Sequence, residues 1–245
     1  MRMRSKFKIG TIAGISVYAH WSLVVTLAGL FVWLLWQNAS LLMAVDGLVL
    51  TVALFGCVIL HEFGHALTAR RFGIATHHIT MYPIGGIALL ARMPRDPRQE
   101  LLIAIAGPAV NLAVAASLFV AVLVTGNRLG LALIVEDGTG RAVILSSLMY
   151  MNLALVAFNL IPAFPMDGGR VLRAVLARRL SYRTATRISS YVGQALAALF
   201  ALAAVFPNPV IRDFNPILLF VAVFVFSAAR AEAAHVLHSR EPQTA

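Results

Sequence analysis

Six long apolar stretches dominate this sequence and leave little room for a water-soluble domain. A helix needs about 20 mainly apolar residues to cross the hydrocarbon core of a bilayer. Each stretch comes close to that length, and together they occupy roughly residues 18–36, 47–70, 100–125, 142–163, 188–206 and 214–236. Only 12% of the 245 residues are charged, well below the proportion in ordinary soluble chains. The sequence therefore predicts an all-α polytopic membrane protein with about six transmembrane helices.

Lysine and arginine are distributed unequally among the segments that connect these stretches. Seventeen of the twenty lie at the two ends of the chain or in the connections near residues 70–98 and 170–187. Only Arg128, Arg141 and Arg212 lie in the alternate connections. Because short cytoplasmic loops retain basic residues, we predict that both termini are cytoplasmic. The expected location is the plasma membrane. This bias explains the net charge of +10 without a nucleic-acid partner.

A short β element is expected between the second and third apolar stretches. Glycine and proline interrupt residues 71–92 too often for a helix, and the runs between them are apolar and β-branched. We predict one or two short strands there, associated with the membrane, and a further strand within residues 10–18. We treat 1–245 as a single transmembrane domain with its core at about 47–170 and a disordered tail at 238–245.

The second apolar stretch contains the motif His61-Glu62-Phe63-Gly64-His65. Residues four apart on a helix differ by about 40° around its axis, so both imidazoles project from one face and can share a metal ion. Glu62 is then close enough to accept a proton from water at that metal. The alternative is a buried, hydrogen-bonded histidine pair without a metal. It is disfavoured because three ionisable residues in an apolar helix are costly unless they have partners.

A catalytic zinc generally takes three protein ligands and keeps one position open. The single cysteine, Cys57, excludes a multi-cysteine site, and we interpret it as a small buried apolar residue. The strongest candidate for the third ligand is Asp167. Pro162 and Pro165 break the fourth helix shortly before it, so we expect Asp167 on irregular backbone that lines a wet cavity. The sequence thus predicts one zinc ion per chain.

Other residues in the apolar stretches are expected to have structural roles. In Ala-Gly-Pro-Ala-Val-Asn at 106–111, Gly107 should allow close helix packing beside a kink at Pro108. Asn111 is expected to hydrogen-bond across helices. Asp46, which precedes the second stretch, is expected to cap that helix. Neighbouring residues on a strand point to opposite faces, so the adjacent His77 and His78 are interpreted as non-ligands.

The sequence contains three motifs in order: H-E-F-G-H at 61–65, A-G-P-A-V-N at 106–111 and N-x-x-P-x-x-P-x-D-G-G at 159–169. Together they resemble the site-2 protease family of intramembrane zinc metalloproteases. The resemblance implies that His61, His65 and Asp167 bind zinc, with Glu62 as the general base. It implies that Asn159 contacts the substrate backbone or steadies the oxyanion. It also implies that a strand containing Gly85, Gly86 and Ile87 receives the substrate. We expect a compact form without the PDZ or CBS domain of larger members.

We therefore predict hydrolysis of a peptide bond within or near a transmembrane segment of a membrane protein, as in regulated intramembrane proteolysis. The expected partners are that substrate and the lipid bilayer, and the oligomeric state is not indicated. One alternative is an ion or proton transporter, although the sequence lacks the paired half-repeats common in such proteins. The other is a catalytically silent membrane adaptor, which the presence of Glu62 beside both histidines disfavours.

Overall fold

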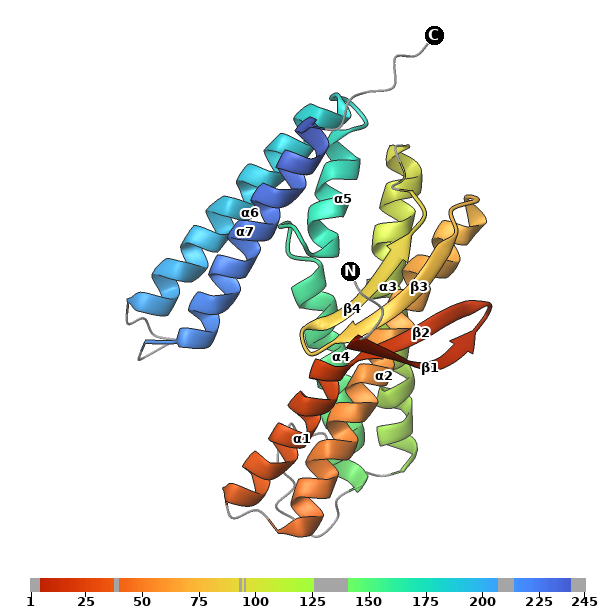
Figure 1. Cartoon of the computed structure of the whole chain (residues 1–245), viewed down its shortest axis with the longest axis vertical. Helices are drawn as coiled ribbons and strands as arrows, with labels where there is room; N and C mark the ends of the chain where they lie inside the picture. Colours follow the sequence, from red (N-terminus) through yellow and green to blue (C-terminus); the bar gives the residue numbers. More distant parts are fainter. Residues whose placement is uncertain are drawn as a thin grey trace. The chain divides into compact units, whose positions relative to one another are not determined.

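The computed structural model describes residues 5–37, 40–92, 94, 96–125, 141–206 and 214–238. Its helices and strands are shown in Figure 1. The helices are α1 (Trp21–Trp36), α2 (Leu41–Arg71), α3 (Pro97–Val124), α4 (Arg141–Asn159), α5 (Asp167–Leu176), α6 (Tyr182–Val205) and α7 (Pro216–His238). The strands are β1 (Lys6–Ile12), β2 (Ile15–His20), β3 (Thr76–Tyr82) and β4 (Gly85–Leu90).

The predicted class, a mostly helical membrane protein, is confirmed. Within the described residues, α2, α3, α6 and the Pro216–Val236 part of α7 are long and apolar enough to cross a membrane. Trp21–Trp36 and Ile144–Asn159 are shorter apolar helices. All six predicted stretches are therefore helical. The first is shorter than expected because β2 continues to His20 and occupies its beginning.

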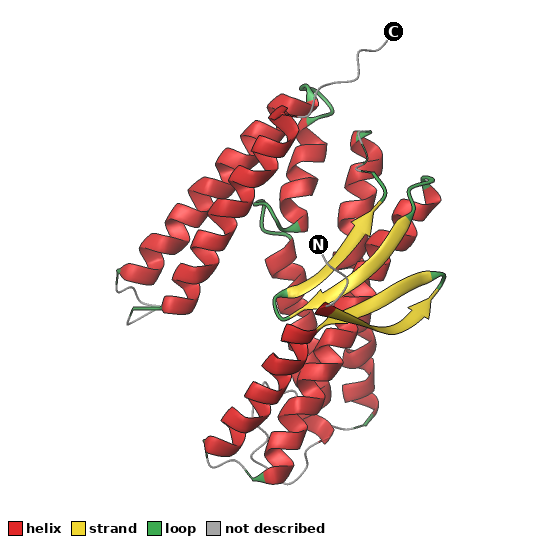
Figure 2. Cartoon of the chain, viewed as in Figure 1, coloured by secondary structure: helices red, strands yellow, loops and turns green. Residues whose placement is uncertain are grey.

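The strands form one sheet in the order β1-β2-β3-β4 (Figure 2). Strands β1 and β2 pair antiparallel, β2 and β3 pair parallel, and β3 and β4 pair antiparallel. One or two strands were expected within 71–92, and two are present, β3 and β4. The N-terminal segment contributes two strands instead of one and starts at Lys6, before the predicted range. The turn between β1 and β2 has positive φ angles at Ala13 and Gly14.

The chain divides into two compact units, each described here by itself. The first contains Met1–Met93 and Ala106–Ala157. In it, alternate residues of β2 are buried on one face of the sheet. This face packs on α2 around a core formed by Ile15, Val17, Ala19, Leu23, Phe63, Ala66, Ile79 and Met81. Because Phe63 lies inside the His61–His65 motif, the core fixes the sheet beside that motif.

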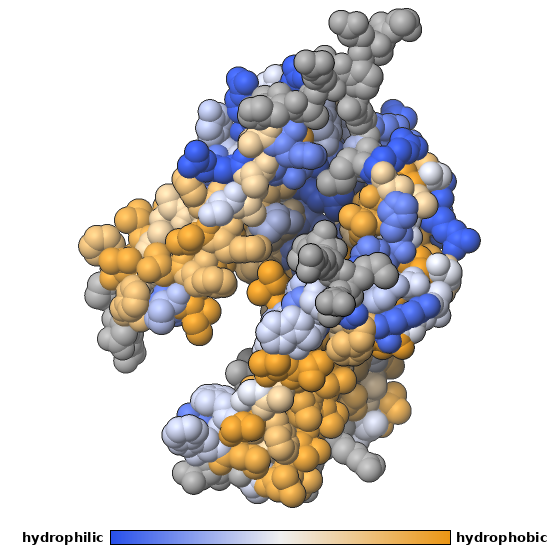
Figure 3. Space-filling view, in the orientation of Figure 1, coloured by the Kyte–Doolittle hydropathy of each residue, from blue (hydrophilic) through white to orange (hydrophobic). Residues whose placement is uncertain are grey.

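The second unit contains Pro94–Ile105 and Phe158–Ala245. Helices α6 and α7 lie side by side in it (Figure 1), and the Ser190 hydroxyl donates a 2.7 Å hydrogen bond to the Ala229 carbonyl oxygen between them. Hydrophobic side chains cover much of the outer surface of these helices in Figure 3, and hydrophilic ones gather where α6 begins and α7 ends. This surface is typical of helices that cross a bilayer.

The structure corrects two expectations about helix ends and extends a third. Helix α2 begins at Leu41, where the Ser40 hydroxyl accepts a 3.2 Å hydrogen bond from the Met43 N–H. Asp46 therefore lies inside the helix and does not cap it. Asp167 is the first residue of α5, a helix that was not predicted, and so does not lie on irregular backbone. Helix α7 reaches His238, and residues 239–245 of the expected tail lie outside the described residues.

Candidate metal centre and active site

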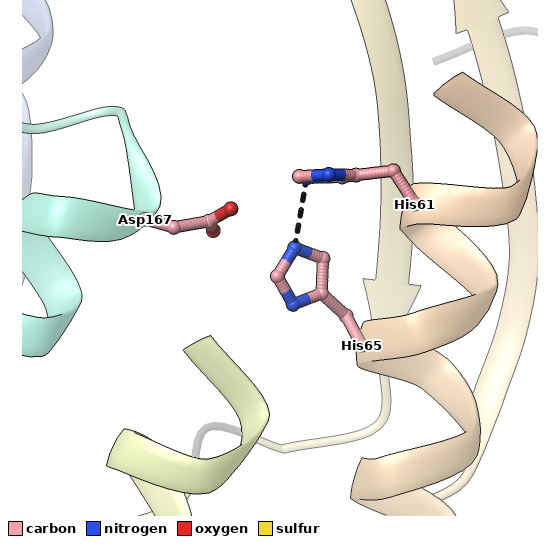
Figure 4. A group of neighbouring side chains, drawn as sticks. All are labelled: His61, His65 and Asp167. Carbon is pink, nitrogen blue, oxygen red and sulfur yellow. Dashed lines mark hydrogen bonds between the residues drawn. The ribbon is translucent and has the colours of Figure 1, made fainter. Parts of the chain in front are cut away.

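His61 and His65 form the centre of the candidate site. Helix α2 is continuous through the motif, so the two residues lie one turn apart, and both imidazoles project from the same side of the helix (Figure 4). They are buried, with exposed fractions of 6% and 5%. Their Nε2 atoms are 3.1 Å apart. Two nitrogens bound to one tetrahedral zinc at about 2.0–2.1 Å lie roughly 3.3 Å apart, so the pair fits a shared zinc ion.

Gly107 of α3 lies directly against both imidazoles. A Cβ atom at this position would come 2.3 Å from His65 Nε2 and 2.7 Å from His61 Cε1. At the residues next to His65 and Gly107, a Cβ atom at Gly64 of α2 would come 2.6 Å from the Ala106 carbonyl oxygen of α3. The predicted close helix packing is present, but the contact of Gly107 with the histidines was missed. The sequence does not show that α3 packs on α2, and without that information the contact of Gly107 with the imidazoles cannot be predicted.

Glu62 lies on the neighbouring part of α2 and faces strand β4. Its side chain is partly buried, and a Cβ atom at Gly86 would come 2.6 Å from Glu62 Cγ and 3.3 Å from Oε1. The missing side chain at Gly86 therefore leaves the space that Glu62 occupies. Of the residues predicted to receive the substrate, Gly86 lies beside the predicted base, and Gly85 has a φ of +135° that favours glycine.

Strand β4 is an edge of the sheet. Within the described sheet, it pairs with β3 on one side and with no strand on the other. Ile87 is 55% exposed. An edge strand presents unpaired backbone groups that can pair with another extended chain. This feature agrees with the predicted receiving role of residues 85–87 and does not by itself identify what binds there.

Asp167 belongs to the second unit, where its position is fixed by the segment before it. It is the first residue of α5 and is buried, with an exposed fraction of 7%. A Cβ atom at Gly168 would come 2.3 Å from the carbonyl oxygens of Leu160 and Ile161, so the first turn of α5 packs on the segment that follows α4. Asn159, the last residue of α4, is partly exposed.

His61, His65 and Asp167 form a group of buried side chains that could hold a metal ion, and Figure 4 draws all three. Two imidazoles and a carboxylate are donors that zinc accepts.

The residues predicted not to bind the metal have other surroundings. Lys6 Nζ lies 3.0 Å from His78 Nε2, and burial, followed by the charges of Lys6 and His77, lowers the pKa of His78 below its usual value. Cys57 is buried, as expected.

Comparison with known proteins identifies the family. A model of peptidase family M50 matches residues 49–136 and 135–200, more than half of the chain. The chain belongs to peptidase family M50. This M50 match confirms the resemblance to site-2 proteases, which are intramembrane zinc metalloproteases. It also agrees with a zinc ion as the metal for the buried group of two histidines and an aspartate.

A curated protein and a solved structure from Methanocaldococcus jannaschii are similar to this M50 chain. The zinc metalloprotease MJ0392 is 32% identical over 231 residues, which are 94% of this chain and 61% of that protein. The solved structure of a site-2 protease has a TM-score of 0.65 and 30% identity, and the match covers 98% of this chain and 99% of that one. The chain spans about 60% of the length of several curated relatives that it matches.

Proposed function

We propose that this M50 chain hydrolyses a peptide bond within or near a transmembrane segment of a membrane protein. The observation that carries the proposal is the buried pair of imidazoles with Nε2 atoms 3.1 Å apart and Glu62 between them in sequence. Their helix is long and apolar enough to cross a membrane. Ionisable residues in such a helix mark function by default because they are costly there.

His61, His65 and Asp167 are the proposed ligands of one zinc ion. Zinc held by three protein ligands makes water acidic enough to attack near neutral pH and polarises a carbonyl group. The two imidazoles are supplied by α2 and the carboxylate by the first turn of α5. Asp167 follows Pro162 and Pro165, and the packing of Gly168 against the segment after α4 limits where this carboxylate can lie.

Glu62 is the proposed general base. Its carboxylate takes a proton from the attacking water and delivers it to the nitrogen of the leaving amine. Burial of its stem against Gly86 limits the conformations that the side chain can adopt. Asn159 is proposed to donate a hydrogen bond from its side-chain amide to the developing oxyanion, or to hold the backbone of the substrate. Neither residue is a metal ligand in this proposal.

The substrate is proposed to add a strand to the outer edge of β4. A helix presents its peptide bonds poorly because its carbonyl groups are already hydrogen-bonded, so the substrate must unwind locally. An unwound segment in the membrane needs partners for its backbone groups, and strand addition at Gly85, Gly86 and Ile87 supplies them. Since Gly86 lies against Glu62, a segment paired there would run close to the proposed base.

The same proposal includes the orientation and the extent of the domain. From the distribution of lysine and arginine, both termini are proposed to lie in the cytoplasm. The membrane is proposed to be the plasma membrane. The range 1–245 is proposed to act as one protease domain, with residues 47–170 as its core, because the three motifs at 61–65, 106–111 and 159–169 lie within that core. The substrate is a transmembrane protein that the sequence does not identify.

Cleavage by the purified protein tests this function. The protein in detergent is incubated with a panel of single-span membrane proteins, with and without a chelator, and zinc is then returned to the chelated sample. Cleavage that stops with the chelator and resumes with zinc supports the proposal. Flux of ions or protons without any cleavage would favour a transporter instead, and stable substrate binding without cleavage would favour an adaptor.

A further inference from the structure

Arg173 is a buried arginine in the middle of α5 with an exposed fraction of 1%. Its Nε donates a 2.8 Å hydrogen bond to Glu100 Oε1, and its Nη2 lies 2.5 Å from the same oxygen. Its Nη1 lies 2.5 Å from Glu232 Oε1. A buried charge is costly unless it is paired and hydrogen-bonded. Glu100 of α3 and Glu232 of α7 provide that pairing within the second unit.

Two aromatic rings also contact the same guanidinium. The centres of the Phe164 and Tyr182 rings each lie 4.9 Å from Arg173 Cζ. Phe164 belongs to the segment between α4 and α5, and Tyr182 is the first residue of α6. The planar guanidinium can bind carboxylates at its edge and rings at its faces, which the compact ammonium group of lysine cannot reproduce. Arg173 thus connects α5 to each neighbouring segment of its unit.

Helix α5 needs such contacts because it is short. It has 10 residues, and its N-cap Met166 supplies no side-chain hydrogen bond. Isolated helices shorter than about 12–15 residues are marginal in water, so packing must hold this one in place. The first turn packs on residues 160–164 at Gly168 and Gly169. Arg173, six residues after Asp167 or about 9 Å along the axis, fixes the rest of the helix.

We infer that Arg173 is a positioning residue for the Asp167 carboxylate. By binding Glu100 and Glu232 together, it sets the position and rotation of α5 and so fixes where the first residue of that helix presents its oxygens. The inference rests on the proposed function, in which Asp167 is a zinc ligand. It assigns Arg173 no contact with the substrate or the metal.

The test compares zinc binding by Arg173→Lys with that of the wild-type protein. Zinc affinity is measured by competition with a chelator, the absorption spectrum of the cobalt-substituted protein reports the ligand geometry, and thermal unfolding of the metal-free protein reports stability. We expect zinc affinity to fall about 10- to 100-fold, as for residues that support metal ligands, with an altered cobalt spectrum. The unfolding midpoint of the metal-free protein should stay close to that of the wild type.

Matched variants separate the possible outcomes. Arg178→Lys changes an exposed arginine just after α5 and should leave affinity and spectrum unchanged. Glu100→Gln keeps a hydrogen-bond acceptor for Arg173 but removes the negative charge. If Arg173→Lys does not fold, the same measurements are made on Glu100→Gln. If Arg173→Lys or Glu100→Gln keeps wild-type zinc affinity while Asp167→Ala weakens it, the role of Arg173 is wrong and the proposed function still stands. Unchanged affinity in Asp167→Ala would overturn the third-ligand proposal and this inference with it.

Discussion

Gly107 of α3 lies so close to His65 of α2 that a Cβ atom at position 107 would come 2.3 Å from the imidazole Nε2. Folded proteins do not tolerate a contact of this length. The nearest atoms of His61 and His65 belong to rigid imidazole rings in a buried site, so neither ring can move aside without leaving the shared position. The glycine therefore belongs to the metal centre, although it has no side chain to bind a metal.

Gly107→Ala should remove most of the zinc from the purified protein. The added methyl group must displace one or both imidazoles, and overpacking of this kind typically costs about 1–3 kcal/mol of stability. Metal analysis of the purified variant gives the zinc content per chain. Gly56→Ala, in the same helix as the histidines and with no neighbouring atom within 4 Å of its Cβ, is the matched control and should keep its zinc. Full zinc occupancy in Gly107→Ala would contradict the packing described here.

Gly86→Ala should lower turnover while the zinc stays bound. Its Cβ would come 2.6 Å from Glu62 Cγ, so the carboxylate must move, whereas the histidines are untouched. A positioned proton acceptor contributes about 10²–10⁴ in rate, and we expect a loss of at least about 10-fold. Gly10→Ala in β1, which has no neighbouring atom within 4 Å, serves as the control in the same cleavage assay. Equal turnover in both variants would show that Gly86 does not confine Glu62.

Proline substitutions at Ile87 and Ala88 test the outer edge of β4. In an antiparallel pair, successive residues direct their N–H groups alternately toward the partner strand and away from it. One of the two substitutions therefore removes a bond to β3, and the other removes a donor at the outer edge. The substitution that removes the outer-edge donor should impair cleavage of helical substrates but leave zinc content and thermal stability near those of the wild type. Full activity in both folded variants would place the substrate elsewhere.

The features predicted from the sequence are those that depend on local pattern. Apolar length located six of the seven described helices, and the glycines and proline in 71–92 distinguished the strands β3 and β4 from them. Helix α5 was missed because two prolines and two glycines discourage a helix locally, and contacts such as Arg173 with Glu100 stabilise it. The strand from Lys6 was missed because its lysines were interpreted only as topology signals.

In the candidate site, too, the features that depend on local sequence were predicted and those that depend on tertiary packing were not. The spacing of His61 and His65 alone predicts a shared face, and their Nε2 atoms confirm it. The contacts of Gly107 with the imidazoles and of Gly86 with Glu62 depend on how α3 and β4 pack on α2. A single sequence does not specify such pairings. They were therefore found only in the three-dimensional structure.

Cysteine labelling tests the orientation. A cysteine introduced as Ser40→Cys in a Cys57→Ala background lies just before α2. The proposed topology puts this position on the side opposite the basic connections. An impermeant thiol reagent should label it from outside the cell only. Arg178→Cys in the same background should be labelled only after the cytoplasmic side is exposed. Labelling of position 40 from the cytoplasm would reverse the proposed topology.

Paired measurement of zinc content and peptide cleavage in Glu62→Gln tests the central claim most directly. Glutamine keeps the size of the side chain but cannot accept a proton, and Glu62 is not a proposed ligand. We predict that the variant retains about one zinc ion per chain, as the wild type should, and loses nearly all cleavage. Substantial cleavage by the zinc-loaded variant would contradict the assignment of Glu62 as the base that serves the His61 and His65 metal centre.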